Sequence, residues 1–439
     1  MVYSINIFVN YQLRKFYSTK EIIMKIIFKS ILSLGLVQGI NLLIPLIVTP
    51  FLIKKIGVST FGVLATAQSV IVFFTLFTDF GFNITSVRRL AMANKHKETI
   101  EGIVNGVFYL KLCLLFIAML LYGALVFSVP LFYQHYNIYL FSFVIVIGQT
   151  FMPLWFYQGT EQIQKTILPV VILKIITVVT ILKLVKNSDD AYKVNVVFGL
   201  GNLITGIFLY FLIHKKYAIS IKRINFNLLK EEFKESIAIY VSNLGVYIFA
   251  NTSLLILSFY LTPYLLGIYS VVDKIIQLLK AMLGLIHHVT YPRLCNLLKE
   301  STSNLKPFIK NIYGIIWTSV FVGCITLFFS SNFIVSYFIQ APNSKAIAIN
   351  ILKCLSFIVF ITSLNMPFYQ TLLAFKKDWL TVKILLLGSL LSIILNLLLI
   401  PTLSIKGTIF TVYIIESLVT ISFIVAVYQL KKKKLLLFD

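Results

Sequence analysis

Charged residues are scarce in this sequence. Only 12% of the 439 residues are Asp, Glu, Lys or Arg, and 59% are hydrophobic. A soluble domain carries about twice that charged fraction. The composition therefore excludes an ordinary soluble domain and indicates a chain that crosses a membrane many times.

Cysteine and recognisable catalytic motifs are scarce as well. The four cysteines are scattered and form no CxxC pair and no Cys/His cluster, which argues against a metal site or a disulfide framework. The sequence contains no nucleotide-binding loop and no Ser/His/Asp set. We therefore expect no cofactor, no bound metal and no enzymatic activity. Any active transport would have to use an ion gradient or a downhill substrate gradient.

Acidic residues are the scarcest charged class. The chain has 15 Asp and Glu against 39 Lys and Arg, which gives a net charge of +24. Lys and Arg concentrate in alternate connections between the apolar runs, as the positive-inside rule requires of cytoplasmic loops. This pattern predicts that both termini are cytoplasmic. It also explains most of the net charge, so we expect no nucleic-acid partner.

Uncharged runs of bilayer length predict twelve transmembrane helices, since about 20 apolar residues cross the roughly 30 Å hydrocarbon core as a helix. Pro130 with His135, and Thr262 with Pro263, supply breaks within the two longest runs. The predicted fold is therefore an all-α polytopic membrane protein. Its spans are residues 30–53, 56–78, two within 112–160, 166–185, 194–213, two within 236–289, 311–332, 347–371, 380–400 and 406–430.

Two pairs of similar segments indicate an internal repeat. Residues 61–64 and 266–269 open the second and eighth predicted spans, and residues 152–158 and 366–370 lie in the fourth and tenth. These places favour two six-helix bundles related by a pseudo-two-fold axis along the membrane normal. The predicted divisions are a cytoplasmic N-terminal lead-in (1–27), an N-terminal lobe (28–214), a cytoplasmic linker (215–235), a C-terminal lobe (236–430) and a basic cytoplasmic tail (431–439).

The eighth predicted span carries the most polar residues on one helical face. Asp273, Gln277, Lys280, Gly284 and His287 are spaced four, three, four and three residues apart, so they align along one side of a helix. A charge near the bilayer centre costs about 2.5–3.5 kcal/mol or more, and such residues usually face water, a partner or a substrate. The alternative is a structural polar seam between helices.

The second predicted span carries the matching stripe of the repeat. Under the offset of 205 residues, Asp273 falls on Gln68 and Lys280 on Thr75, and Asp79 continues the same helical face. We therefore expect the two polar stripes to line one central cavity between the lobes.

Amides in two further spans have two possible uses. Gln38 and Asn41 lie in the first predicted span, and Asn243 and Asn251 lie in the seventh. They can hydrogen-bond sugar hydroxyls, although hydrogen bonds between helices are the commoner use of such residues.

Isolated charges in other spans also leave two interpretations open. Lys111 and Lys174 either extend to the membrane interface or attract an anion into the cavity. Glu416 suits either an ion-coupling site or a helix-packing role.

Five short segments form a recognisable set: TPFLIKKIG (49–57), TDFGFNITSVRRLA (78–91), PLWFYQGTEQ (153–162), GIYS (267–270) and LNLLLIPTLSIKGT (395–408). Together they resemble the Wzx-type O-antigen and capsular repeat-unit flippases, which belong to the multidrug/oligosaccharidyl-lipid/polysaccharide exporter superfamily. Residues 1–23 have no counterpart in that family, and Met24 is an alternative start. Thr408, after Gly407, stands where that family usually has a small residue.

The resemblance implies a substrate and a location. The substrate is an oligosaccharide repeat unit on undecaprenyl pyrophosphate, moved across the bacterial inner membrane for O-antigen, capsule or exopolysaccharide biosynthesis by alternating access. The residues expected to bind the pyrophosphate are the four lysines within the predicted spans, Lys280, Lys274, Lys111 and Lys174. Sugar-binding or cavity-lining residues are Gln38, Asn41, Gln68, Thr75, Asn243, Asn251 and Gln277. Candidates for coupling to H⁺ or Na⁺ are Asp273, Glu416 and Asp79.

The expected partners are the lipid-linked oligosaccharide, membrane lipids and other polysaccharide assembly proteins, with a monomeric transport unit. Two alternative functions remain. A drug or cation antiporter of the same superfamily would need acids in its cavity, whereas cations outnumber acids in these spans. A membrane-embedded polysaccharide polymerase would need a long external loop with catalytic Arg or His, and the longest predicted external segment, residues 333–346, holds one lysine.

Overall fold

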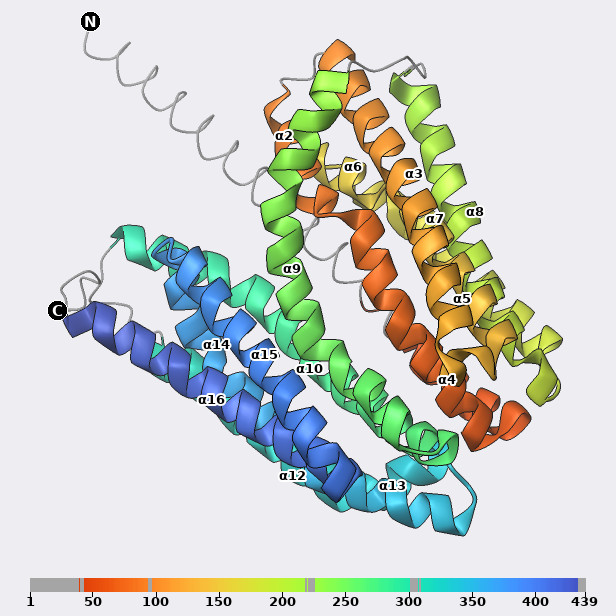
Figure 1. Ribbon diagram of the computed structural model, residues 1–439. Helices are drawn as coiled ribbons and strands as arrows, with labels where there is room; N and C mark the ends of the chain where they lie inside the picture. The colour runs from red at the N-terminus through yellow and green to blue at the C-terminus, as the bar shows by residue number, and fades with distance from the viewer. Residues whose placement is uncertain are drawn as a thin grey trace, which may run out of the picture.

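The computed structural model describes residues 43–93, 97–217, 226–300 and 309–432, together with the single residues 39, 219 and 307. Every regular element in this part of the chain is a helix, and it contains no strand. Figure 1 shows long helices gathered into two groups. The predicted all-α class is confirmed.

The first half of the chain begins with a helical segment at residues 43–79. Gly57 within it has a φ of 80°, a left-handed conformation that suits glycine, at the boundary predicted between the first two spans. The helices that follow are α2 (Phe82–Met92), α3 (Lys97–Ser128), α4 (Pro130–Tyr133), α5 (Tyr136–Thr150), α6 (Leu154–Gly159), α7 (Gln164–Leu184), the short η1 (Ser188–Asp190) and α8 (Ala191–Tyr217).

The second half of the described chain is also built of helices. Its longest member, α10, runs without a break for 38 residues. The elements are α9 (Phe226–Tyr260), α10 (Pro263–Glu300), the π-helical turn η3 (Ile309–Tyr313), α12 (Gly314–Phe338), α13 (Pro342–Leu355), α14 (Ile358–Ala374), α15 (Asp378–Leu403) and α16 (Ile405–Lys432).

Nine segments of the described chain are long and apolar enough to cross a membrane. Large apolar side chains cover their outer faces; for example, Phe329 and Phe333 of α12 are 78% and 83% exposed. Such continuous apolar surfaces require lipid rather than water. The chain is therefore a multi-pass membrane protein. The nine do not include α9 and α10, so the count of twelve spans stays a prediction.

Helix contacts divide the molecule into two packed groups. In one group α5 packs against α8 and α3, α7 packs against α8, and α2 packs against α6; in the other, α14, α15 and α16 pack together, with α10 against α14. Helix α9 contacts both groups, because it touches α2 and α3 as well as α15 and α10. Figure 1 shows α9 between the two groups, which converge near α4 and α13 and diverge toward α2 and α14.

A matching pair of turns supports the internal repeat. Glu161 and Lys376 have φ values of 56° and 57° and follow the two similar segments at 152–158 and 366–370. In both turns the amide of the left-handed residue donates to the carbonyl three residues back, at 3.0 and 2.9 Å. The next amide donates to the carbonyl five residues back, at 2.7 and 2.9 Å. This is the same helix-ending motif at both places.

The two glycines of the other repeated motif lie against each other. A Cβ atom on Gly62 would lie 2.1 Å from the carbonyl oxygen of Pro263 and 2.6 Å from the nitrogen of Gly267. A Cβ on Gly267 would lie 2.0 Å from the carbonyl oxygen of Val58. Only glycine fits such contacts, so the starts of the 58–79 segment and of α10 form one close backbone contact. We call this contact the glycine junction.

Candidate functional site

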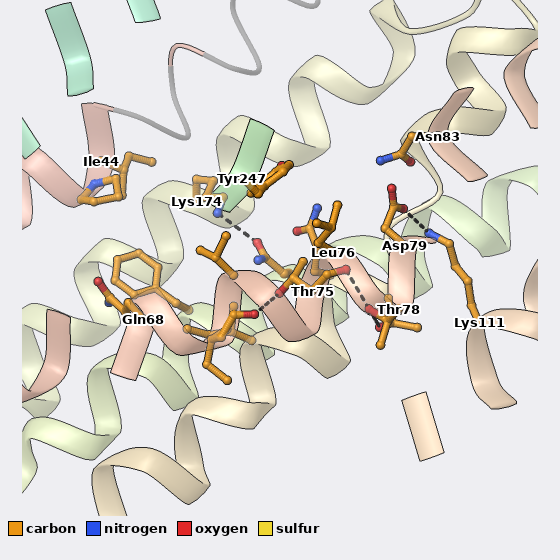
Figure 2. Close-up of a pocket in the computed structure, with 18 residues that line it drawn as sticks. Ile44, Gln68, Thr75, Leu76, Thr78, Asp79, Asn83, Lys111, Lys174 and Tyr247 are labelled. Atoms are coloured by element: carbon orange, nitrogen blue, oxygen red, sulfur yellow. Dashed lines mark hydrogen bonds and ion pairs between the residues drawn. The ribbon is translucent and has the colours of Figure 1, made fainter. Parts of the chain in front are cut away.

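A polar cavity with a volume of about 420 Å³ lies in the first group of helices. Figure 2 shows this N-terminal cavity with its lining residues. Helix α9 also reaches it, through Tyr247. The polar and aromatic residues that line it are Gln68, Thr75, Thr78, Asp79, Asn83, Lys111, Gln149, Thr150, Lys174, Phe198, Asn202 and Tyr247.

An ion pair lies at one end of the N-terminal cavity. The Nζ atom of Lys111 on α3 is 3.0 Å from Oδ1 of Asp79, and the Lys111 side chain is 4% exposed. Asp79 is held at the end of its helix because the chain leaves the helical conformation at Phe80 and Gly81, which have φ values of 47° and 84°. The sequence left Lys111 as an isolated cation, but Asp79 neutralises it.

Lys174 on α7 is the uncompensated cation of this cavity. Its Nζ donates to the Oδ1 atom of Asn202 on α8 at 2.9 Å, and it forms no ion pair with any residue in the described ranges. Figure 2 shows Lys174 apart from the Asp79–Lys111 pair. Two lysines and one aspartate therefore line the cavity, which leaves a formal excess of one positive charge.

The second polar cavity lies in the other group of helices and has a volume of about 220 Å³. Lys280 on α10 is paired with Glu416 on α16, with 2.6 Å between Nζ and Oε1. Asp273, two turns before Lys280, also lines this C-terminal cavity, so two acids and one lysine leave a formal excess of one negative charge. Its polar and aromatic lining is Ser253, Tyr269, Asp273, Gln277, Lys280, Thr362, Asn365, Ser392 and Glu416.

Lys274 lines neither cavity and instead joins the two groups. Its Nζ lies 4.8 Å from the centre of the Phe61 ring and 3.5 Å from Oε1 of Gln68. Gln68 in turn donates to Oδ1 of Asn195 at 2.8 Å, and Asn195 donates to Oγ of Ser142 at 2.6 Å. This chain of polar contacts begins at residues that flank the glycine junction.

The structure therefore separates the four lysines predicted to bind pyrophosphate. Lys111 and Lys174 share the N-terminal cavity, Lys280 lies in the C-terminal cavity, and Lys274 lies between the groups. The two polar stripes likewise line two cavities rather than the single central one that the sequence suggested. The physical reason is the glycine junction, which brings the two helices into backbone contact where their stripes begin.

The remaining predicted residues divide in the same way. Thr75 lines the N-terminal cavity and Gln277 the C-terminal cavity, whereas Asn243 and Asn251 line neither. The Nδ2 atom of Asn251 donates to the carbonyl oxygen of Tyr247 at 3.2 Å. Gln38 and Asn41 lie outside the described residues.

The sequence did not single out several cavity residues, because each is an uncharged polar residue that stands alone in the sequence. Asn202 is the most informative, since it holds Lys174. A search for amides on the sixth predicted span would have found it. The others are Asn83, Gln149 and Asn365.

Charged contacts attach the start of α9 to the first group. Arg89 is 3.4 Å from Glu232 and Arg88 is 3.3 Å from Glu235, while the Phe80 and Phe233 rings stack at 4.5 Å. Glu232 precedes the predicted span that begins at residue 236. Burial raises the pKa of Glu232 to about 7, against the lowering effect of Arg89. Arg88 and Arg89, which lie between the second and third predicted spans, thus attach the start of α9 to the first group.

Solved structures share this arrangement along nearly the whole chain. An inward-facing multidrug resistance MATE transporter of the MOP superfamily has a TM-score of 0.75, with 13% identity, over 91% of this chain and 95% of that one. The outward-facing form of such a transporter gives 0.59 at 14% identity, over 93% and 96%. The lipid II flippase MurJ in an inward closed conformation gives 0.66 at 14% identity, over 92% and 87%. The fold is therefore that of the MOP superfamily of membrane transporters.

The sequence comparison identifies the family within this fold. The model of the polysaccharide biosynthesis protein family matches residues 27–298, which is more than half of the chain. The chain belongs to that family. A "Putative O-antigen transporter" of Escherichia coli (strain K12) is 23% identical over 62% of this chain and 65% of its own length. One of Shigella dysenteriae is 26% identical over 68% of this chain and 74% of its own.

Proposed function

We propose that this protein is a flippase for oligosaccharide repeat units linked to undecaprenyl pyrophosphate in the bacterial inner membrane. The names of the two bacterial relatives support an O-antigen-type substrate, and the flippase among the solved structures supports a lipid-linked one. The observation that carries the proposal is Lys174, a cation without an acidic partner among the described residues, in a cavity lined by amides and hydroxyls.

Each part of such a substrate has a matching part of the N-terminal cavity. A phosphate group needs charge-assisted hydrogen bonds, and Lys174 supplies a donor that a carboxylate does not already occupy. Sugar hydroxyls need groups that both donate and accept, and Asn202, Gln149 and Asn83 offer them. The lipid tail stays in the bilayer, so the cavity needs to hold only the polar head.

The C-terminal cavity supplies the proposed ion coupling. Asp273 lies in the same cavity as the Lys280–Glu416 pair, and the second acid leaves one carboxylate in excess. Such a site favours H⁺ or Na⁺ over an anionic substrate. In this proposal the N-terminal cavity binds the substrate and the C-terminal cavity binds the coupling ion, in place of the single substrate cavity expected from the sequence.

The glycine junction and the predicted topology together support an inward-facing state of the transporter. Residues 54–55 and 262–263 connect predicted spans on the external side, so the junction closes the external end while the two groups diverge toward the cytoplasm. The greater likeness to the inward-facing MATE structure supports the same state. Both termini are cytoplasmic in this proposal, which the positive-inside rule supports.

Lys174→Ala and Lys174→Arg test the proposal in cells that lack their own flippase and carry this chain with its native glycan pathway. We expect Lys174→Ala to lower surface polysaccharide at least about tenfold, because one charge-assisted contact to phosphate is lost. Lys174→Arg should retain most of the export. Immunoblots of the membrane fraction establish equal expression. Normal export by a well-expressed Lys174→Ala variant would overturn the assignment of the cavity.

A drug or cation antiporter is not favoured. A cationic substrate requires uncompensated acids, whereas the N-terminal cavity has an excess lysine and the smaller C-terminal cavity has one excess acid, which we assign to ion coupling.

A further inference from the structure

Two lysines converge on one neutral oxygen at the end of the first group of helices, away from both cavities. The Oε1 atom of Gln162 accepts a hydrogen bond from Nζ of Lys165 at 2.8 Å and another from Nζ of Lys216. The amide nitrogen of Gln162 donates to the hydroxyl of Tyr217 at 2.5 Å. Together with Lys215, these residues form what we call the lysine–glutamine cluster.

This convergence is electrostatically unfavourable as it stands. Two ammonium groups share one acceptor that carries no charge, and like charges at such distances repel. The side-chain contact with Lys216 lowers the pKa of Lys165, and burial and the charge of Lys216 act in the same direction. Exposed lysines that served only as topology signals would extend apart into water.

A hollow of about 340 Å³ adjoins the cluster and lacks a compensating acid. Lys165, Lys215 and Lys216 line it, and no carboxylate belongs to the part of its lining that the structure describes. Gln162 also lines it, and the rest of the wall is apolar or aromatic: Phe156, Tyr157, Leu212, Ile213 and Tyr217. Cations beside an apolar wall match a ligand with an anionic head and a hydrocarbon chain.

Local structure explains why these residues meet. The left-handed turn at Glu161 ends α6 and places Gln162 ahead of α7, while Lys215 and Lys216 lie in the last turn of α8, where cations are favourable. The hydroxyl of Tyr157 donates to the carbonyl oxygen of Leu209 at 2.9 Å, which fixes α6 against α8.

The repeat shows that the turn alone does not produce the cluster. At the equivalent turn in the second half, Lys376 and Lys377 are followed at once by Asp378, the first residue of α15. Asp378 takes the place of Ile163 in the first turn, whose acid is instead Glu161, the left-handed residue itself.

We propose that the lysine–glutamine cluster binds the phosphate group of an anionic lipid at the cytoplasmic face. The lipid chain would lie against the apolar and aromatic residues of the hollow, which include Phe156 and Tyr217. The phosphate would replace the neutral Gln162 oxygen as the shared partner of Lys165 and Lys216. Membrane phospholipid and the lipid-linked diphosphate substrate offer the same chemistry. The proposal does not depend on the flippase function.

Lipid binding to the purified full chain in nanodiscs tests this site. The probe is phosphatidylglycerol in a phosphatidylcholine background, measured by native mass spectrometry after release into detergent. Lys165→Gln/Lys216→Gln should weaken phosphatidylglycerol binding about tenfold, because two charge-assisted contacts are lost. The matched control is Lys183→Gln/Lys186→Gln, which removes the same charge at the other end of α7. Equal binding by the two double variants would overturn the proposal.

Gln162→Glu provides a second test that removes no lysine. The new carboxylate would pair with Lys165 and Lys216 in place of the lipid phosphate, so phosphatidylglycerol binding should fall by a similar factor while thermal stability holds or rises. A cluster with only a structural role would gain stability without any change in lipid binding, and that result would contradict the site.

Competition identifies the source of the phosphate. Displacement of phosphatidylglycerol by undecaprenyl pyrophosphate at equimolar amounts would assign the site to the incoming substrate. Retention of phosphatidylglycerol would assign it to membrane phospholipid, and both outcomes support a lipid site. Saturation by inorganic phosphate at the same concentration would assign it to a soluble anion and overturn the lipid proposal.

Discussion

The two cavities arise from related helices but carry opposite excess charge. In the N-terminal cavity, Asp79 neutralises Lys111, and Lys174 is the excess cation. In the C-terminal cavity, Lys280 neutralises Glu416, and Asp273 is the excess acid. Equivalent positions on the repeat thus hold chemically different groups. A repeated fold can therefore divide anion binding and cation binding between its halves without altering the packing of either.

The sharpest contrast between the cavities concerns stability. Lys280→Met leaves Glu416 without its cation, and removing one partner of a buried pair costs about 3 kcal/mol or more. Lys174→Met leaves no acid without its partner among the described residues and should cost about 1 kcal/mol, the value of a hydrogen bond. Thermal unfolding of the purified variants measures both. In Lys280→Met/Glu416→Leu most of the loss should be recovered, and an additive loss would show that the pair is not coupled.

The glycine junction that separates the cavities comes next in expected effect. Gly267→Ala places a Cβ 2.0 Å from a backbone oxygen, and relieving such overpacking costs about 1–3 kcal/mol. The control is Gly284→Ala on the same helix, where no atom lies within 4 Å and alanine should stabilise the helix by up to about 1 kcal/mol. Opposite shifts in unfolding temperature are expected. Equal shifts would mean that the helices are not in backbone contact.

A single substitution should make the N-terminal cavity resemble its counterpart. Asn202→Asp gives Lys174 a carboxylate at about the 2.9 Å now spanned by the amide oxygen. The cavity then has no excess cation, and polysaccharide export should fall about tenfold, the equivalent of 1.4 kcal/mol of substrate binding. Export assays with Asn202→Ser as control measure the effect. If Asn202→Asp transports as well as Asn202→Ser, the excess charge does not serve the substrate.

The smallest effect is the pH dependence of the contact between α9 and the first group. Because the pKa of Glu232 is raised to about 7 by burial, the folded state binds a proton that the unfolded state releases above its ordinary pKa. Stability should therefore fall as pH rises to about 7 and then level off. Glu232→Gln should flatten this slope in thermal unfolding at several pH values. An unchanged slope would assign the pH dependence to other groups.

The sequence predicted the class of fold because that class depends on local properties. Runs of apolar residues, the distribution of lysine and arginine, and the repeated glycine and Met-Pro segments all appear along the chain itself. The helical polar faces at Gln68–Asp79 and Asp273–Lys280 follow from spacing alone. These faces do line cavities in the structure.

The pairing of the charges depends on tertiary packing and did not follow from the sequence. Lys280 is 136 residues from Glu416, and Lys111 is 32 residues from Asp79, so each pair requires two helices to pack in a defined register. The excess charge of each cavity follows only from these pairs. One central cavity was expected because nothing local indicates that two glycines 205 residues apart bring the starts of their helices into backbone contact.

Because α10 is long, a small rotation at the glycine junction moves the far end of this helix over a large distance. About 33 residues follow Gly267 in this helix, which at 1.5 Å per residue is an arm of roughly 50 Å. A tilt of about 10° at such a fulcrum displaces the far end by roughly 9 Å, comparable to the width of a sugar ring with its hydration. A mouth wide enough for an oligosaccharide can thus open and shut while the atoms at the pivot scarcely move.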